Sequence, residues 1–105
     1  MKAIRFEGRK IDAVNLGTMD IRDQTKALQR LIGGYIEVVR IADDAAMLVD
    51  EDGYCKCLPP NPAASLFAGR LILGTALVVG IAENEDEELY FTDCPKRFGL
   101  AKENA

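Results

Sequence analysis

The sequence predicts an α+β domain: a mostly antiparallel sheet of five or six strands, with one main helix on one face and a short helix near residues 62–68. Two observations carry this prediction. Short runs rich in Val, Ile and Leu alternate with turn residues along most of the chain, which is typical of strands. Only residues 20–32 repeat their apolar side chains with the spacing of a long amphipathic helix.

Strands are expected at residues 3–7 and 11–16, joined by a hairpin turn. The main helix follows, because Asp20 is a suitable N-cap and the next residues place their apolar side chains on one face. Gly33 marks its end, since glycine readily adopts the left-handed conformation that closes many helices.

Residues 35–58 form the densest run of strand-forming residues, and two acidic turns divide it into three expected strands. The Asp-Gly pair at 52–53 is typical of a two-residue hairpin turn. If the Asp-Asp pair at 43–44 is also a two-residue turn, Glu37 lies opposite Asp50 on one sheet face. Like charges in this position destabilise a sheet. The pairing therefore implies a cationic partner, a raised carboxyl pKa or a register that differs by one residue.

The second half of the chain predicts a helix over residues 62–68, with Asn61 as its N-cap and a proline in its first turn. Residues 70–81 are almost entirely apolar and predict a strand buried on both faces. An acidic surface loop at 83–88 then leads to an expected edge strand at 89–91.

Length and composition narrow the class of protein. The 105 residues are expected to form one domain, residues 1–105, of ordinary globular composition, with 49% apolar and 29% charged residues. A net charge of −4 with scattered basic residues argues against binding nucleic acid. The longest apolar run, residues 71–82, is too short to span a bilayer. Three cysteines and an N-terminus unlike a signal peptide indicate a reduced, cytoplasmic protein.

No catalytic motif is recognisable. The chain contains no histidine, which removes the usual acid–base group at neutral pH and the commonest metal ligand. A nucleophile elbow, a P-loop and a dinucleotide-binding glycine motif are also missing, so neither catalytic residues nor a cofactor are predicted. Cys55 and Cys57 are closer together than paired zinc ligands usually are, and ordinary reduced thiols are expected.

The candidate ligand-binding residues come from the central strands and from the start of the second helix. The carboxylates of the expected Glu37–Asp50 pair would suit a cation or a ligand. Backbone N–H groups after Asn61 would suit an anion beside Arg70, although a simple helix cap is the favoured role of Asn61. The complete candidate set is Tyr35, Glu37, Asp50, Glu51, Asn61 and Arg70.

Four stretches, in this order, resemble one known family. They are residues 31–39 (LIGGYIEVV), 49–53 (VDEDG), 58–61 (LPPN) and 74–80 (GTALVVG). The chain resembles, over about residues 2–80, an uncharacterised family of small domains from bacteriophages, plasmids and other mobile elements, domain of unknown function 3846. The resemblance implies a mobile-element accessory protein of the kind that often binds or blocks host machinery, including in host–virus interaction. It implies no activity.

Three functional hypotheses follow. The first is a small cytosolic, non-enzymatic protein that sequesters a small ligand or occludes a host protein, as a counter-defence or host-modulating accessory. The second is a small carboxylate-based hydrolase or transferase, metal-assisted, that uses Glu37 with Asp50 or Glu51. The third is an interaction module whose acidic loop at 83–88 docks on a basic protein surface. A homo-oligomer is a further expectation, because a sheet edge near residues 54–58 could pair with a second chain.

Overall fold

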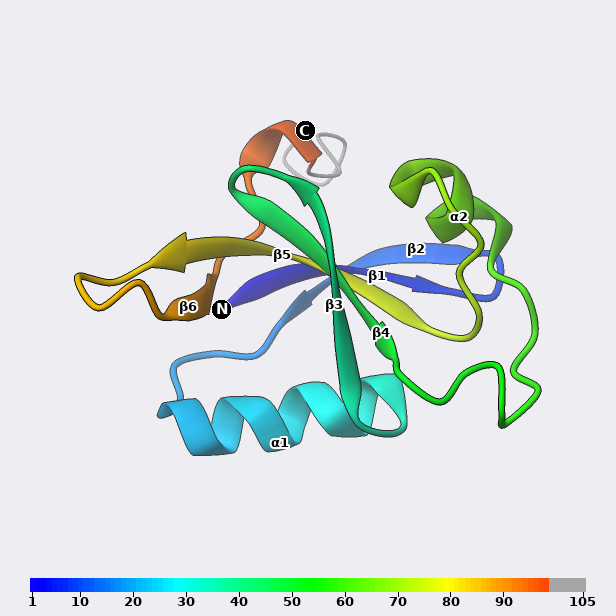
Figure 1. The fold of residues 1–105 in the computed structure, drawn as a ribbon, viewed down its shortest axis with the longest axis horizontal. Helices are drawn as coiled ribbons and strands as arrows, with labels where there is room; N and C mark the ends of the chain where they lie inside the picture. Colours follow the sequence, from blue (N-terminus) through cyan, green and yellow to red (C-terminus); the bar gives the residue numbers. More distant parts are fainter. Residues whose placement is uncertain (99–105) are drawn as a thin grey trace.

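The computed structural model describes residues 1–98, which form a six-stranded antiparallel sheet and two α-helices (Figure 1). The α+β class predicted from the sequence is confirmed. The elements in chain order are β1 (Lys2–Glu7), β2 (Lys10–Asn15), α1 (Ile21–Ile32), β3 (Ile36–Ala42), β4 (Ala45–Asp50), α2 (Pro62–Ala68), β5 (Ala76–Glu83), β6 (Leu89–Thr92) and the short 3-10 helix η1 (Lys96–Phe98).

Strand β5 is the centre of the sheet. The strand order is β2-β1-β5-β4-β3, and β4 pairs with one edge of β5. Strands β1 and β6 share its other edge, with β1 opposite residues 76–78 and β6 opposite residues 80–83. Strands β2 and β3 are therefore the two ends of the strand order.

The two α-helices lie on opposite sides of the sheet (Figure 1). Leu28 and Ile32 of α1 pack in one apolar cluster with side chains of β4 and β5. Ala64 of α2 belongs to a second cluster, formed on the other face of the sheet with Val39, Met47 and further side chains. The strands β4 and β5 are buried on both faces for this reason. No helix among the described residues is long and apolar enough to cross a membrane.

The ends of α1 follow the sequence prediction. The Asp20 side chain accepts a hydrogen bond from the Asp23 N–H at 2.9 Å, which caps the first turn. Gly33 has a φ of 94°, in the left-handed region, and its N–H donates to the Gln29 carbonyl.

Asn61 ties α2 to the sheet. Its side chain is buried, its Oδ1 accepts a hydrogen bond from the Ala64 N–H, and the predicted N-cap is confirmed. Its Nδ2 donates to the carbonyl of Phe6 at 2.9 Å and to the carbonyl of Gly74 at 2.8 Å. One side chain thus satisfies groups from β1, from α2 and from the segment that precedes β5.

Two strand predictions are wrong. The expected strand over residues 54–58 is absent, because residues 51–57 form consecutive turns, and the proposed oligomer edge there does not exist. Local hydrogen bonds hold this segment in turns, such as those from the Asp52 N–H to the Asp50 carboxylate and from the Cys57 N–H to the Tyr54 carbonyl. The strand expected from residue 70 begins only at Ala76, because the preceding segment bonds instead to the loop before α2.

We expect Asn61→Ala to destabilise the protein by about 3 kcal/mol. The change removes the helix cap and leaves two buried carbonyl groups without their donor. The free energy of unfolding in urea measures the effect. Asn84→Ala is the matched control, because Asn84 bonds only within the exposed loop between β5 and β6, and its loss should cost less than about 1 kcal/mol. Equal losses in the two variants would contradict the role given to Asn61.

Candidate functional site

Glu37 and Asp50 lie on opposite faces of the sheet, so the predicted pairing of these two carboxylates is wrong. Asp50 is opposite Ile36, whereas Glu37 is opposite Val49. The strand register shifts at a β-bulge near Ile41, just before the turn into β4. One extra residue in a strand moves every later side chain to the other face, which explains the difference.

The Asp50 carboxylate is part of a buried structural cluster. Its side chain is 1% exposed, and it accepts hydrogen bonds from Lys56 Nζ at 2.7 Å and from the Asp52 N–H at 2.8 Å. Lys56 also donates to the Gly33 carbonyl at the end of α1. A Cβ at Gly34 would lie 2.6 Å from Lys56 Nζ and 2.9 Å from an Asp50 carboxylate oxygen, so a larger residue at this position would displace the ion pair.

The ion pair between Asp50 and Lys56 changes the pKa values of both groups. Burial by itself would raise the pKa of the Asp50 carboxyl, but the hydrogen bonds from Lys56 and Asp52 outweigh it and hold that pKa below its ordinary value. The hydrogen bond with Asp50 raises the pKa of Lys56. Asp50 is therefore a charged structural group whose oxygens are already in use.

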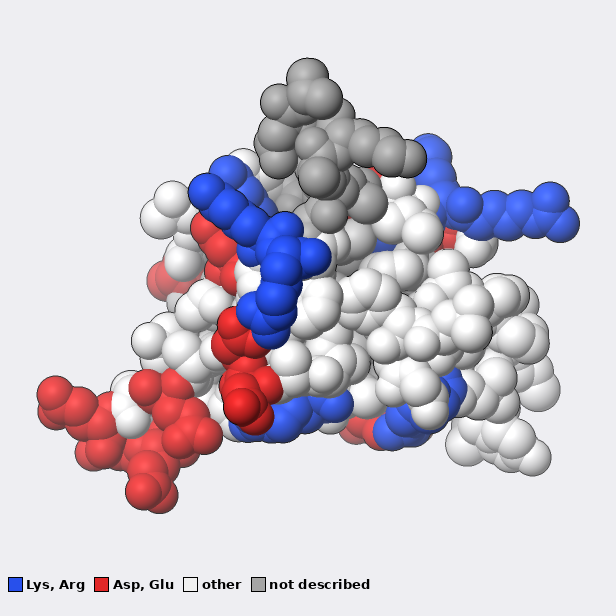
Figure 2. All heavy atoms as spheres, turned by 90° about the horizontal axis from the view of Figure 1, so that it is seen from above, with Lys and Arg blue, Asp and Glu red and all other residues white. Residues whose placement is uncertain are grey.

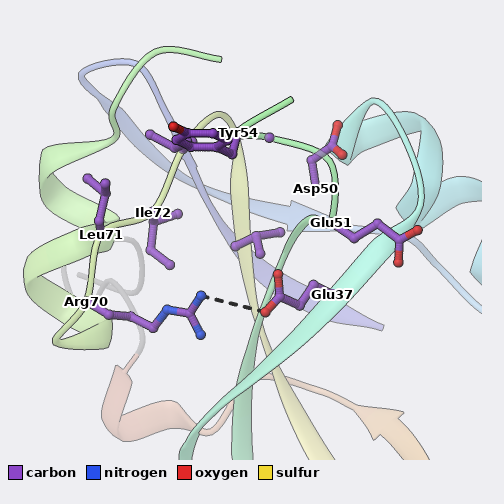
Figure 3. Close-up of a pocket in the computed structure, with 10 residues that line it drawn as sticks. Glu37, Asp50, Glu51, Tyr54, Arg70, Leu71 and Ile72 are labelled. Carbon is purple, nitrogen blue, oxygen red and sulfur yellow. Dashed lines mark ion pairs between the residues drawn. The ribbon is translucent and has the colours of Figure 1, made fainter. Parts of the chain in front are cut away.

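A groove of about 210 Å³ lies on the α2 side of the sheet, beside Glu37 (Figure 3). Strands β3 and β4 form one wall and residues 70–73 form the other, with Ile72 and Val49 as buried apolar lining. The lining residues are Glu37, Val49, Asp50, Glu51, Gly53, Tyr54, Arg70, Leu71, Ile72 and Leu73.

An ion pair crosses this groove. The Arg70 guanidinium points toward the Glu37 carboxylate, and the closest nitrogen and oxygen are 3.6 Å apart (Figure 3). Both side chains are about half-exposed, at 54% and 43%. An exposed pair of this kind contributes little to stability, so both groups are free to exchange partners with a ligand.

The rim of the groove is apolar and exposed. Tyr54 is 85% exposed and Leu71 is 66% exposed, and each comes from a loop rather than from a strand or helix. Glu51 is also on the rim, with its carboxylate directed away from Arg70 (Figure 3). Sequence reasoning missed Tyr54 and Leu71 because both fell inside expected strands, where an apolar side chain is unremarkable.

The groove brings together part of the candidate set. Glu37, Glu51 and Arg70 line it, and Asp50 lies behind it with its side chain buried. Tyr35 is 67% exposed just before β3 and does not line the groove. Asn61 lies away from it, at a second hollow of about 450 Å³, and its amide is occupied by the contacts that hold α2.

The cysteines do not lie in the groove. Cys55 and Cys57 are exposed in the turns after β4, and Cys94 is half-buried near β1. Burial raises the pKa of the Cys94 thiol to about 11, so this thiol stays protonated at neutral pH. Within residues 1–98 no group of three or more acidic or cysteine side chains is arranged to hold a metal ion.

The geometry defines a small α+β protein with an open groove that is crossed by the Glu37–Arg70 ion pair. The chain belongs to the family described as a domain of unknown function (DUF3846), whose model matches residues 1–98. The match extends past the region of resemblance recognised in the sequence and includes the acidic loop and β6. No curated protein and no solved structure shows significant similarity to the chain.

Asp50 contributes to the pH dependence of the free energy of unfolding, and we expect Lys56→Met to reverse the sign of this contribution. In the native protein the Asp50 pKa lies below its unfolded value of 3.8, so its contribution is present above about pH 4 and is lost as the pH falls through the folded pKa. Without Lys56 burial dominates and the pKa rises above the unfolded value, so ionisation costs stability as the pH increases.

Urea midpoints measured below pH 4 and at pH 7, with a direct NMR titration of the Asp50 carboxyl, test this expectation. Lys26→Met is the matched control, because Lys26 is exposed on α1 and is far from Asp50 in the sequence. An Asp50 pKa that stays below its ordinary value in Lys56→Met would contradict the argument.

Proposed function

We propose that this protein is a small, non-enzymatic, cytosolic binding protein that occludes a partner protein through the Glu37–Arg70 groove. The size of the groove supports a protein partner over a sequestered small molecule. Small-molecule sites usually have volumes of about 300–1,000 Å³ and enclose most of the ligand. This groove is smaller, about 210 Å³, and open along its rim. The hollow beside Asn61 is larger, about 450 Å³, but the Asn61 amide is occupied by the fold and the Glu37–Arg70 pair is not part of that hollow.

The exposed apolar side chains carry the proposal. Tyr54, Leu66 and Leu71 are 85%, 86% and 66% exposed, and they come from the groove rim and from α2. No charged residue occurs between Lys56 and Arg70, and Figure 2 shows an extended uncharged surface on the side of α2. Exposed apolar surface beside tyrosine and arginine is typical of the energetic centre of a protein interface.

Charge favours a basic partner segment. Two carboxylates, Glu37 and Glu51, line the groove against the single guanidinium of Arg70, while the Asp50 charge is already balanced by Lys56. A lysine or arginine side chain of the partner could replace Arg70 on Glu37 and stack on the exposed Tyr54 ring. A host protein as the partner is consistent with the mobile-element context that the family resemblance implies.

The two other functional hypotheses receive less support. A carboxylate-based hydrolase that uses Glu37 with Asp50 or Glu51 needs two facing carboxylates. Asp50 is on the opposite face of the sheet from Glu37, and the Glu51 carboxylate points away from the Glu37–Arg70 pair (Figure 3). The acidic loop at 83–88 remains an alternative docking element. It is folded by Asn84, whose Oδ1 accepts hydrogen bonds from the Asp86 and Glu88 N–H groups, and its carboxylates lie away from the α2 side (Figure 2).

Selection from a random linear peptide library displayed on phage tests the proposal. We expect the selected peptides to combine a basic residue with apolar residues, because the groove offers a carboxylate beside an apolar rim. Their affinity should fall at least about tenfold in Tyr54→Ser and in Glu37→Gln, which remove a main apolar contact and the acceptor. Titration with a labelled peptide measures the loss.

Matched controls separate the groove from the rest of the surface. Tyr90→Ser changes an exposed tyrosine on β6, and Glu85→Gln changes a carboxylate of the acidic loop; both should bind as the native protein does. Loss of binding in Glu85→Gln with full binding in Glu37→Gln would favour the acidic loop as the docking element. Hydrolysis or chemical conversion of a bound peptide, lost in Glu37→Gln, would overturn the non-enzymatic proposal.

A further inference from the structure

Strand β3 is an open edge of the sheet. It is seven residues long, lies at the end of the strand order, and pairs only with β4 among the described residues. Natural edge strands are commonly blunted by lysine, by proline or by a bulge. β3 contains no lysine or proline, and its single bulge is confined to its end near Ile41.

The pairing with β4 determines which backbone groups of β3 face outward. The Glu51 N–H donates to the Tyr35 carbonyl at 3.0 Å, so Tyr35 faces β4. Backbone groups alternate between the two sides of a strand in an antiparallel ladder. The N–H and C=O groups of Ile36, Val38 and Arg40 therefore point away from β4, toward the open edge.

This edge is complementary to itself. If two copies meet antiparallel with Val38 opposite Val38, then Ile36 of each copy lies opposite Arg40 of the other. All three outward-facing residues of each copy then form hydrogen-bonded pairs, in which both N–H groups donate to the opposite carbonyls. The bulge lies outside these pairs.

Other symmetric registers are less favourable. Centring the pair on Glu37 or on Arg40 would place like charges opposite each other, which destabilises a sheet. Centring it on Val39 would require pairing beyond the bulge, at Ala42. The charge pattern and the bulge together select the register centred on Val38.

Exposed apolar side chains support the same register. Val38 is 47% exposed and would meet Val38 of the second copy on the α1 side of the sheet. Tyr35 is 67% exposed and would lie opposite Ile41 of the second copy, which packs on the α2 side. Both contacts bury apolar surface that the single chain leaves in water.

We propose that two copies of this chain associate through β3, antiparallel and centred on Val38, into one continuous sheet. The partner is a second copy, because the edge supplies matching backbone groups, matching apolar side chains and no opposed like charges in one register. This inference does not depend on the ligand of the Glu37–Arg70 groove. Peptide binding and oligomeric state are measured separately, so the failure of one proposal is distinguishable from the failure of the other.

Light scattering after size exclusion, over a range of protein concentrations, should show a dimer for the native chain. Val38→Pro should weaken the association by about a hundredfold or more, because it removes both N–H donors of the central pair. Its lost N–H points outward, so the β4 pairing of the single chain is retained. Circular dichroism and the urea midpoint verify that the variant folds.

Ala13→Pro is the matched control on the opposite edge. The Leu16 N–H donates to the Met1 carbonyl, so by the same alternation the Ala13 N–H faces outward from β2. This variant should remain dimeric. Val38→Lys supplies a second test, because it keeps the N–H but brings two positive charges together across the symmetry axis, and its dimer should recover in high salt.

Amide hydrogen exchange tests the proposed register of the β3–β3 pairing directly. The amides of Ile36, Val38 and Arg40 should become more protected as protein concentration increases, while the outward amides of β2 should not. A monomer at every concentration would overturn the proposal. So would a dimer that persists in folded Val38→Pro, which would point instead to the uncharged surface over α2.

Discussion

The ion pair between Asp50 and Lys56 connects the parts of this structure that matter most for its groove. Asp50 ends β4, and its carboxylate holds the Asp52 N–H and the Lys56 ammonium, which in turn reaches the Gly33 carbonyl at the end of α1. The loop over residues 51–57 is thereby folded back against the helix terminus. Tyr54 owes its position on the rim of the groove to this fold.

Local signals allowed correct predictions wherever one side chain decides the structure. Asp20 and Asn61 are short polar side chains before helix starts, and both cap the helices they precede. Gly33 likewise ends α1 in the left-handed conformation that the sequence suggested. These interactions lie within a few residues of each other in the chain, so the sequence alone contains the information that specifies them.

The pairing and register of the strands could not be predicted from such local signals. All six residues of β4 are buried, because both faces of the strand are covered, and such a strand has no polar face from which its register could be read. A one-residue bulge near Ile41 was enough to separate Glu37 from Asp50. The prediction of a third strand at residues 54–58 was wrong for a related reason. The Asp50 carboxylate binds Lys56 and holds it in a turn, but the sequence indicated only that Asp50 is a strand residue.

Burial divides the candidate site residues into two groups with different roles. Asp50 and Asn61 are 5% and 2% exposed, and every polar atom of their side chains is hydrogen-bonded within the fold. A ligand could reach them only by breaking hydrogen bonds that hold α1, α2 and the sheet together. Glu37 and Arg70 are joined by one long, exposed contact, which a ligand can replace at little cost. Binding chemistry in this protein is therefore expected from the groups that its fold leaves free, at the groove and at the open edge of β3.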